Sequence, residues 1–172
     1  MTGVQTCALP IYRSKPAVVD FDRDGDLDMF VGGQDGKIQY FENAGTASAP
    51  DFQLRLGGAN PFWYLDSIEG APDSEYVPYD VGTAATPALA DLDGDGDLDA
   101  VVGSSGKYGQ LDYFENIEYD LVRQNGTSSP VDFYNYDNDA APALADIDND
   151  GDLDLFTGDR DDEDTIRYFE NT

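Results

Sequence analysis

The chain has 172 residues, of which 36 are acidic and 9 basic, so its formal net charge is −27. A field of this sign disfavours nucleic acid and anionic membrane surfaces as partners and favours cations. Hydrophobic residues make up 40% and aromatic residues 12% of the chain, too much for an acidic disordered tail, so we expect a folded protein. No apolar run is long enough to cross a bilayer, so we expect no direct membrane insertion.

The first segment, residues 1–11 (MTGVQTCALPI), differs from the rest of the chain. It carries no charge and holds the single cysteine, Cys7. It resembles the translation of a widely used DNA-sequencing adapter, so we interpret it as an artefactual leader, with a natural apolar leader as the alternative, and exclude it from the fold. On the first interpretation the natural sequence begins near Tyr12 and is truncated upstream, and the cysteine count indicates nothing about the redox compartment.

Three later segments repeat one pattern: PAVVDFDRDGDLDMFVGG from Pro16, PALADLDGDGDLDAVVGS from Pro87 and PALADIDNDGDLDLFTGD from Pro142. Each is followed by a polar turn and an aromatic signature, KIQYFEN, QLDYFEN or TIRYFEN. The region 12–172 is therefore predicted to hold three copies of one supersecondary unit. We place unit 1 at 16–56, a linker at 57–86, unit 2 at 87–136 and unit 3 at 137–172, the last cut short.

Within a unit the hydrophobic pattern has the period of β-strands. In the signature of unit 1, Ile38 and Tyr40 fall on one face and Gln39 and Phe41 on the other. Each unit is thus predicted to form a strand, an acidic loop, a strand, a tight turn and a strand, and 52–56 and 131–136 are candidates for a fourth strand. No segment has a convincing helical stripe, so we expect an all-β chain.

The acidic loop has the spacing D-x-D-x-D-G-D-x-D in every unit. Its aspartates are Asp20, Asp22, Asp24, Asp26 and Asp28 in unit 1, Asp91, Asp93, Asp95, Asp97 and Asp99 in unit 2, and Asp146, Asp148, Asp150, Asp152 and Asp154 in unit 3. Carboxylates at alternate positions of a curled loop can all face one Ca²⁺, and the glycine at position 6 permits the sharp turn. We predict about three calcium ions, one per loop; a solvated, metal-free turn is the alternative.

By analogy with other calcium loops, positions 1, 3, 5 and 9 should bind through side chains and position 7 through its backbone carbonyl, leaving the position 7 side chain free to face solvent or a second-shell water. The leucines at position 8, Leu27, Leu98 and Leu153, should pack into the core. An EF-hand is excluded because position 12 is not glutamate and the flanking segments are strands.

These units resemble FG-GAP repeats, also called VCBS-type repeats, which build the β-propeller of integrin α-subunit N-terminal regions and occur in many bacterial surface and secreted proteins. The resemblance rests on the acidic loop with its following apolar strand and glycine, and covers residues 16–172. It implies blades of four antiparallel strands around an axis. Since propellers usually have four to eight blades, three units predict an open, incomplete propeller whose remaining blades belong to a longer chain.

The resulting functional hypothesis is a non-catalytic, calcium-stabilised binding or adhesion module, extracellular or on the cell surface, with a protein or carbohydrate ligand that the sequence does not identify. The alternative is an accessory or catalytic propeller fragment of a secreted polysaccharide-degrading enzyme. The chain has no histidine to act as a base and no common nucleophile, phosphate-loop or zinc motif. Trp63 and Tyr64 are candidates for sugar stacking or for packing between blades, and 125–127 (NGT) matches a glycosylation acceptor.

Overall fold

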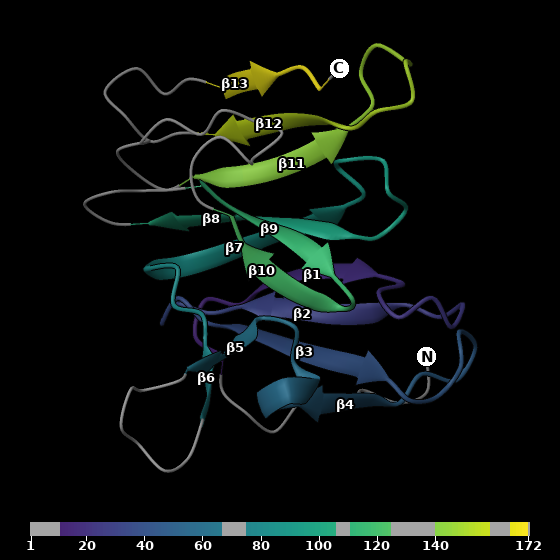
Figure 1. Cartoon of the computed structure of the whole chain (residues 1–172), viewed down its shortest axis with the longest axis vertical. Helices are drawn as coiled ribbons and strands as arrows, with labels where there is room; N and C mark the ends of the chain where they lie inside the picture. Colours follow the sequence, from purple (N-terminus) through teal and green to yellow (C-terminus); the bar gives the residue numbers. More distant parts are fainter. Residues whose placement is uncertain (1–10, 67–74, 106–110, 125–139, 159–165, 172) are drawn as a thin grey trace.

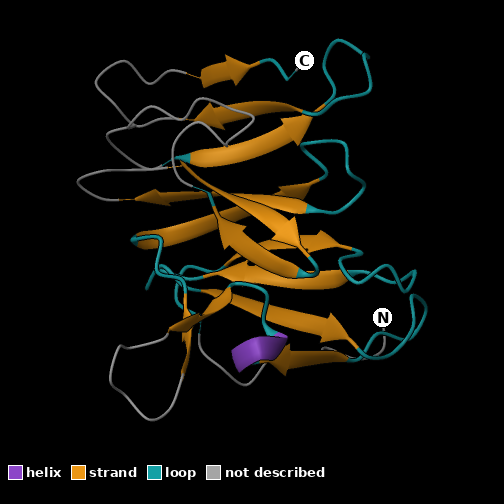
Figure 2. Cartoon of the chain, viewed as in Figure 1, coloured by secondary structure: helices purple, strands orange, loops and turns teal. Residues whose placement is uncertain are grey.

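The fold is that of a computed structural model, which describes residues 11–66, 75–105, 111–124, 140–158 and 166–171. Three antiparallel sheets, here called blades 1, 2 and 3, follow one another in a stack, and a short hairpin lies beside the first two (Figure 1). Nearly all regular structure is strand (Figure 2). The expected all-β class and open propeller arrangement are confirmed, since the described sheets do not close into a ring.

The strands of each blade are consecutive in the sequence. Blade 1 has the order β1 (Lys15–Val19), β2 (Asp28–Gly32), β3 (Ile38–Asn43) and β4 (Phe52–Arg55). Blade 2 has β7 (Thr83–Ala90), β8 (Asp99–Ser105), β9 (Leu111–Ile117) and β10 (Asp120–Arg123), and blade 3 has β11 (Ala141–Ala145), β12 (Asp154–Gly158) and β13 (Ile166–Phe169). The linker holds a 3-10 turn, η1 (Gly57–Ala59), and the hairpin of β5 (Trp63–Asp66) with β6 (Glu75–Pro78). None of the described residues forms a helix long and apolar enough to span a membrane.

The blades meet through their first two strands. Strand β7 contacts β1 and β2, and β11 contacts β7 and β8. Because successive side chains of a strand point to opposite faces, the apolar run of β8 supplies both seams: Ala100 and Val102 join the core toward blade 1, whereas Val101 joins the core toward blade 3. The strand is therefore buried on both faces, which explains why its sequence is continuously apolar rather than alternating.

The seam between blades 1 and 2 is mostly aromatic. The ring of Phe62, from the linker, lies edge-on to Phe30 of blade 1 at 5.7 Å and to Phe114 of blade 2 at 5.1 Å. Packing between blades is thus carried by Phe62, whereas the neighbouring Trp63 is only partly buried and Tyr64 is exposed and lies against Tyr79.

Several expectations need correction. The fourth strand of blade 1 lies within the predicted range 52–56, but that of blade 2 is β10, directly after β9; the other candidate, 131–136, lies outside the described residues, as do 1–10 and 125–127. Strand β7 begins at Thr83, inside the expected linker. Leu27 is 54% exposed rather than tucked into the core, while Leu98 and Leu153 do pack against it.

Candidate metal centres

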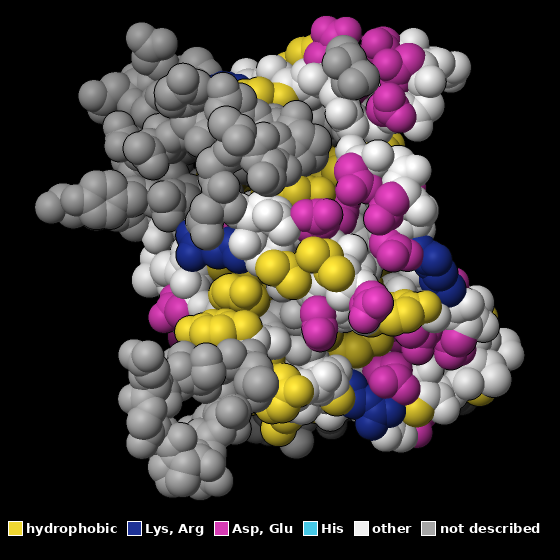
Figure 3. Space-filling model, viewed as in Figure 1, with side chains coloured by type: hydrophobic (Ala, Val, Ile, Leu, Met, Phe, Trp, Pro, Cys, Tyr) yellow, Lys and Arg dark blue, Asp and Glu magenta, His cyan; other side chains and the backbone are white. Residues whose placement is uncertain are grey.

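The three acidic loops occupy equivalent places in the blades. Residues 20–28, 91–99 and 146–154 each connect the first strand of a blade to the second, and all three lie along one side of the stack (Figure 1). Acidic side chains gather on the same side of the molecular surface (Figure 3). The repeat therefore places three similar concentrations of negative charge in a row.

Within each loop, three aspartates bring carboxylate oxygens to within 4.8 Å of one another. The groups are Asp20, Asp22 and Asp24 in loop 1, Asp91, Asp93 and Asp99 in loop 2, and Asp146, Asp148 and Asp150 in loop 3. Calcium binds oxygens at 2.3–2.6 Å, so two ligands of one ion are at most about 5 Å apart. The spacing of the carboxylates matches a single calcium ion in each loop.

The glycine at position 6 makes this clustering possible. Gly25, Gly96 and Gly151 have φ of 96°, 94° and 105°, in the left-handed region where a side chain would be strained. In every loop this glycine donates its N–H to the carboxylate at position 1, at 3.2, 3.0 and 3.2 Å. The turn thus folds the middle of the loop back over its first aspartate.

Loop 1 has buried carboxylate oxygens that lack a partner. Asp20 Oδ1 and Asp26 Oδ1 are buried and accept no hydrogen bond within the described structure. Loss of hydration and the charges of neighbouring aspartates raise the pKa of Asp26, and the pKa of Asp22 is raised as well. An uncompensated buried carboxylate is costly, and a cation in the loop would remove that cost, so the residues present fit calcium.

Asp26 corrects one half of an expectation. As the position 7 residue, its side chain was expected to face solvent or a second-shell water, and it does not face solvent, since Asp26 is only 7% exposed. Among the equivalent residues, Asp97 is half-buried and forms an ion pair with Arg23, and Asp152 is exposed. None of the three belongs to a carboxylate group that could hold a metal, which agrees with a backbone role for position 7.

The aspartate at position 9 has a second partner that the sequence did not reveal. Asp28 is 1% exposed and accepts hydrogen bonds from the Tyr40 hydroxyl at 3.0 Å, the Asn43 N–H at 2.8 Å and the Phe21 N–H at 3.3 Å. Burial, followed by the charge of Asp28, raises the pKa of Tyr40. The carboxylate therefore fixes the acidic loop to the aromatic signature on β3.

The same clamp recurs in the other blades. Asp99 accepts from Tyr113, Asn116 and Leu92, and Asp154 accepts from Tyr168, Asn171 and Ile147. Burial raises the pKa of Asp99 to about 6, although the N–H groups of Asn116 and Leu92 act in the opposite direction. The recurrence of YFEN after each loop was the signal for this contact, which explains why tyrosine and asparagine repeat together.

Not all of the predicted ligands join the carboxylate groups. Positions 1 and 3 join the metal groups in all three loops, position 5 joins in loops 1 and 3, and position 9 joins only in loop 2. The predicted ligands that lie outside these groups are Asp28, Asp95 and Asp154. Both oxygens of Asp28, Asp99 and Asp154 accept hydrogen bonds, so all three position 9 side chains hold the blade together, and Asp99 also joins a metal group.

A basic residue links the first two loops. Arg23, at position 4 of loop 1, has φ of 63° and donates to Gly96 O and Asp97 Oδ1 of loop 2. Position 4 is Arg23, Gly94 or Asn149 in the three loops. In loop 1 its side chain points toward the next blade.

Three nine-residue acidic loops, each joining the first two strands of an antiparallel blade in a stack, define a repeat protein of the propeller type with a candidate cation site in each blade. The family model described as FG-GAP-like repeat matches residues 20–102 and 91–157. The chain belongs to this family. No curated protein and no solved structure matched it.

Proposed function

We propose that the chain is a calcium-stabilised binding or adhesion module that acts outside the cell or on its surface and is not itself an enzyme. The observation that carries the calcium part is the threefold carboxylate group, with ligand oxygens within 4.8 Å of one another and unpartnered buried oxygens in loop 1. FG-GAP repeats are typical of extracellular proteins, which supports the location.

Calcium has a structural task in this fold. Each loop joins two paired strands at the edge of a seam, and its last aspartate also holds the third strand. Calcium in a loop would cancel the repulsion between carboxylates and fix the connection between the strands. Extracellular modules bind calcium with dissociation constants of about 10⁻⁴ to 10⁻³ M, so the sites would be filled outside cells rather than in the cytosol.

Thermal unfolding in calcium and in chelator tests the structural role. A site held at 100 times its dissociation constant adds about 2.7 kcal/mol to stability, so chelation should lower the melting temperature and added calcium should restore it. Asp93→Asn keeps the size of a position 3 ligand but removes its charge, and should shrink the calcium-dependent shift. Asp35→Asn, at an exposed carboxylate in the turn between β2 and β3, is the matched control and should leave the shift unchanged.

The non-catalytic part of the proposal has its own test. Incubation of the full chain with a panel of polysaccharides in calcium should release no new reducing or unsaturated ends. Product that disappears when a carboxylate outside the three loops is replaced by its amide would show an enzyme instead. Binding to glycans or matrix proteins that requires calcium would support the module.

A further inference from the structure

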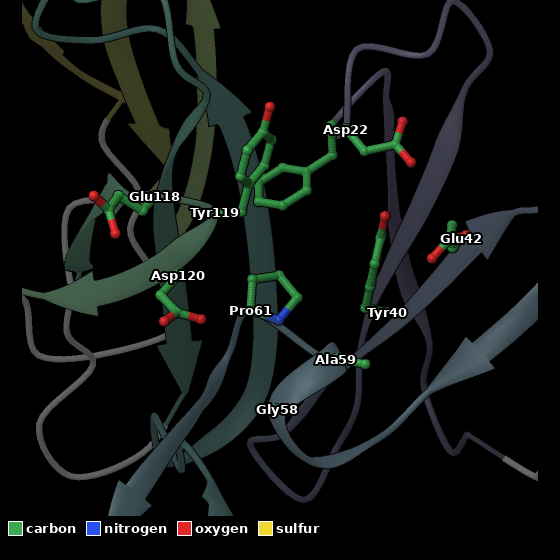
Figure 4. A pocket seen from close by; sticks show the side chains of 10 residues that line it. Asp22, Tyr40, Glu42, Gly58, Ala59, Pro61, Glu118, Tyr119 and Asp120 are labelled. Atoms are coloured by element: carbon green, nitrogen blue, oxygen red, sulfur yellow. The ribbon is translucent and has the colours of Figure 1, made fainter.

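The face of blade 3 that points away from blade 2 repeats the faces that the next blade covers in blades 1 and 2. In blade 1 the buried Tyr40 lies on this face, and Pro61 of the linker and Tyr119 of blade 2 lie across from it (Figure 4). The equivalent Tyr113 of blade 2 is buried in the core shared with blade 3. In blade 3 the equivalent Tyr168 is 44% exposed, and no described strand covers it.

Two further apolar positions of this face behave in the same way. They are position 2 of the acidic loop (Phe21, Leu92 and Ile147) and the start of the third strand (Ile38, Leu111 and Ile166). The residues of blades 1 and 2 at these positions are buried, whereas Ile147 is 61% and Ile166 79% exposed. The ring of Phe156 lies 5.1 Å from that of Tyr168 and extends the same surface. Apolar side chains gathered on one exposed face mark a site of interaction.

The two described seams show what kind of segment fits on such a face. In each seam a carbonyl oxygen and a proline Cδ from the start of the next blade stand within 2.9 Å of the place where a Cβ on a glycine would be. The sets are Ala85 and Pro87 at Gly32, and Ala140 and Pro142 at Gly103. Gly158 is the equivalent glycine of blade 3, and a Cβ there would meet none of the described atoms within 4 Å. The segment that fits has a small residue two places before a proline at the start of a first strand.

Blade 1 of the same chain offers a segment of this kind. Ser14 and Pro16 stand where blade 2 has Ala85 and Pro87. Both residues and Val18 are exposed, whereas Ala85 and Pro87 are buried in the seam. Because alternate residues of a strand share a face, Pro16 and Val18 of β1 point to the same side. The chain therefore carries both halves of a seam, one at each end of the described stack.

We propose that a second copy of this chain seats its blade 1 on the exposed face of blade 3, head to tail, through the contacts that join blade 1 to blade 2. Two copies would bring together six blades, within the four to eight that propellers usually have. The contact is heterologous, because it joins two different surfaces. Each copy has a net charge of −27, so the copies repel one another and should associate more strongly as salt screens the repulsion.

Sedimentation equilibrium of the full chain tests the association. In about 10 mM calcium and about 0.5 M salt, the chain should be a monomer near about 5 µM and approach twice that mass near about 500 µM. At about 0.05 M salt the same concentration should contain fewer dimers. A monomer mass at every concentration and salt level overturns the proposal.

One substitution in each half of the seam should weaken the dimer by at least about tenfold. Gly158→Ala places a Cβ where the carbonyl of the incoming strand would lie, and Val18→Glu buries a charge in the seam. Val122→Glu makes the same change at an exposed valine of β10, outside both halves, and should leave the dimer unchanged. Gly158→Ala should melt like the unsubstituted chain at about 5 µM, where the chain is a monomer. Leu27→Gln, at a residue that is 54% exposed, replaces Val18→Glu if circular dichroism shows that the latter does not fold.

Mixing the two variants tests the head-to-tail arrangement. Gly158→Ala keeps a normal blade 1 and Val18→Glu keeps a normal blade 3, so neither should dimerise alone but an equal mixture should form a dimer with one intact seam. This result would also show that both variants are folded. Dimers of Val18→Glu as stable as those of the unsubstituted chain would show pairing of blade 3 with blade 3, and would overturn the proposal. A mixture of folded variants that stays monomeric would overturn it as well.

Discussion

Substituting alanine for Gly103 should open the seam between blades 2 and 3. This glycine lies on β8, where a Cβ would stand 2.1 Å from the carbonyl oxygen of Ala140 and 2.8 Å from Cδ of Pro142. Both atoms belong to the chain that enters β11, so neither is the free end of a flexible side chain. Gly32 meets Ala85 in the same way, at 2.1 Å, in the seam between blades 1 and 2.

The size of the effect follows from this contact. Ordinary contact begins near 3.4 Å, so the backbones would have to separate by about 1 Å along a seam packed without large gaps. Overpacking of this kind costs about 1–3 kcal/mol. For a chain of this length about 1 kcal/mol corresponds to 2–4 °C, so the melting temperature should fall by about 2–12 °C.

The repeat supplies its own control. Gly158 occupies the equivalent place on β12 in blade 3, but a Cβ there would meet none of the described atoms within 4 Å. Gly158→Ala should therefore leave the melting temperature unchanged or raise it slightly, since alanine reduces the freedom of the unfolded chain. Circular dichroism melts of the two variants in millimolar calcium make the comparison. Equal melting temperatures for Gly103→Ala and Gly158→Ala would refute the close contact between blades.

Two further predictions concern single side chains. Tyr40→Phe removes the hydroxyl that donates to buried Asp28, and should lower the free energy of unfolding in urea by about 1–3 kcal/mol. Tyr168→Phe should lower it less, because Tyr168 is 44% exposed. Equal losses of unfolding free energy in the two variants would contradict the clamp. Burial raises the pKa of Asp112 above 3.8, although Arg123 opposes the rise. Protonated Asp112 therefore stabilises the folded chain below pH 3.8, and this contribution is lost as the pH rises through the raised pKa of the folded state. Asp112→Asn should therefore gain stability relative to the unsubstituted chain between about pH 4 and pH 7, as measured by urea unfolding at both values, and a relative loss would show that the ion pair outweighs burial.

The repeats and their loops could be predicted because the same residue pattern occurs three times in the sequence. The aspartates and the glycine have identical spacing in each copy and are followed by an apolar strand, which indicates the same local fold each time. Gly25, at position 6 of loop 1, has the positive φ that the sharp turn of the loop requires. The fourth strand of blade 1 was predicted for a different reason: its apolar residues alternate with polar ones, and the segment lies between turns that contain Gly and Pro.

What the sequence left open depends on contacts between segments far apart. Strand β10 follows a turn of Glu118 and Tyr119, which carry none of the usual turn signals, so the hairpin was not predicted. The hydrogen bonds of Asp28 to the aromatic signature require the pairing of β2 with β3, which spacing along the chain does not show. Leu27 was expected in the core because position 8 of the loop is leucine in every repeat, but no blade precedes its seam among the described residues.

Calcium stoichiometry addresses the proposed function most directly. The chain, freed of metal with chelator and then dialysed against about 10 mM calcium, well above the dissociation constants of about 10⁻⁴ to 10⁻³ M, should bind about three ions per molecule, one for each carboxylate group, as measured by elemental analysis or calorimetric titration. Replacing the position 3 aspartate of one loop by asparagine should lower that number by one or markedly weaken one site. Retention of no calcium above the buffer level would contradict the proposal that these loops are metal centres.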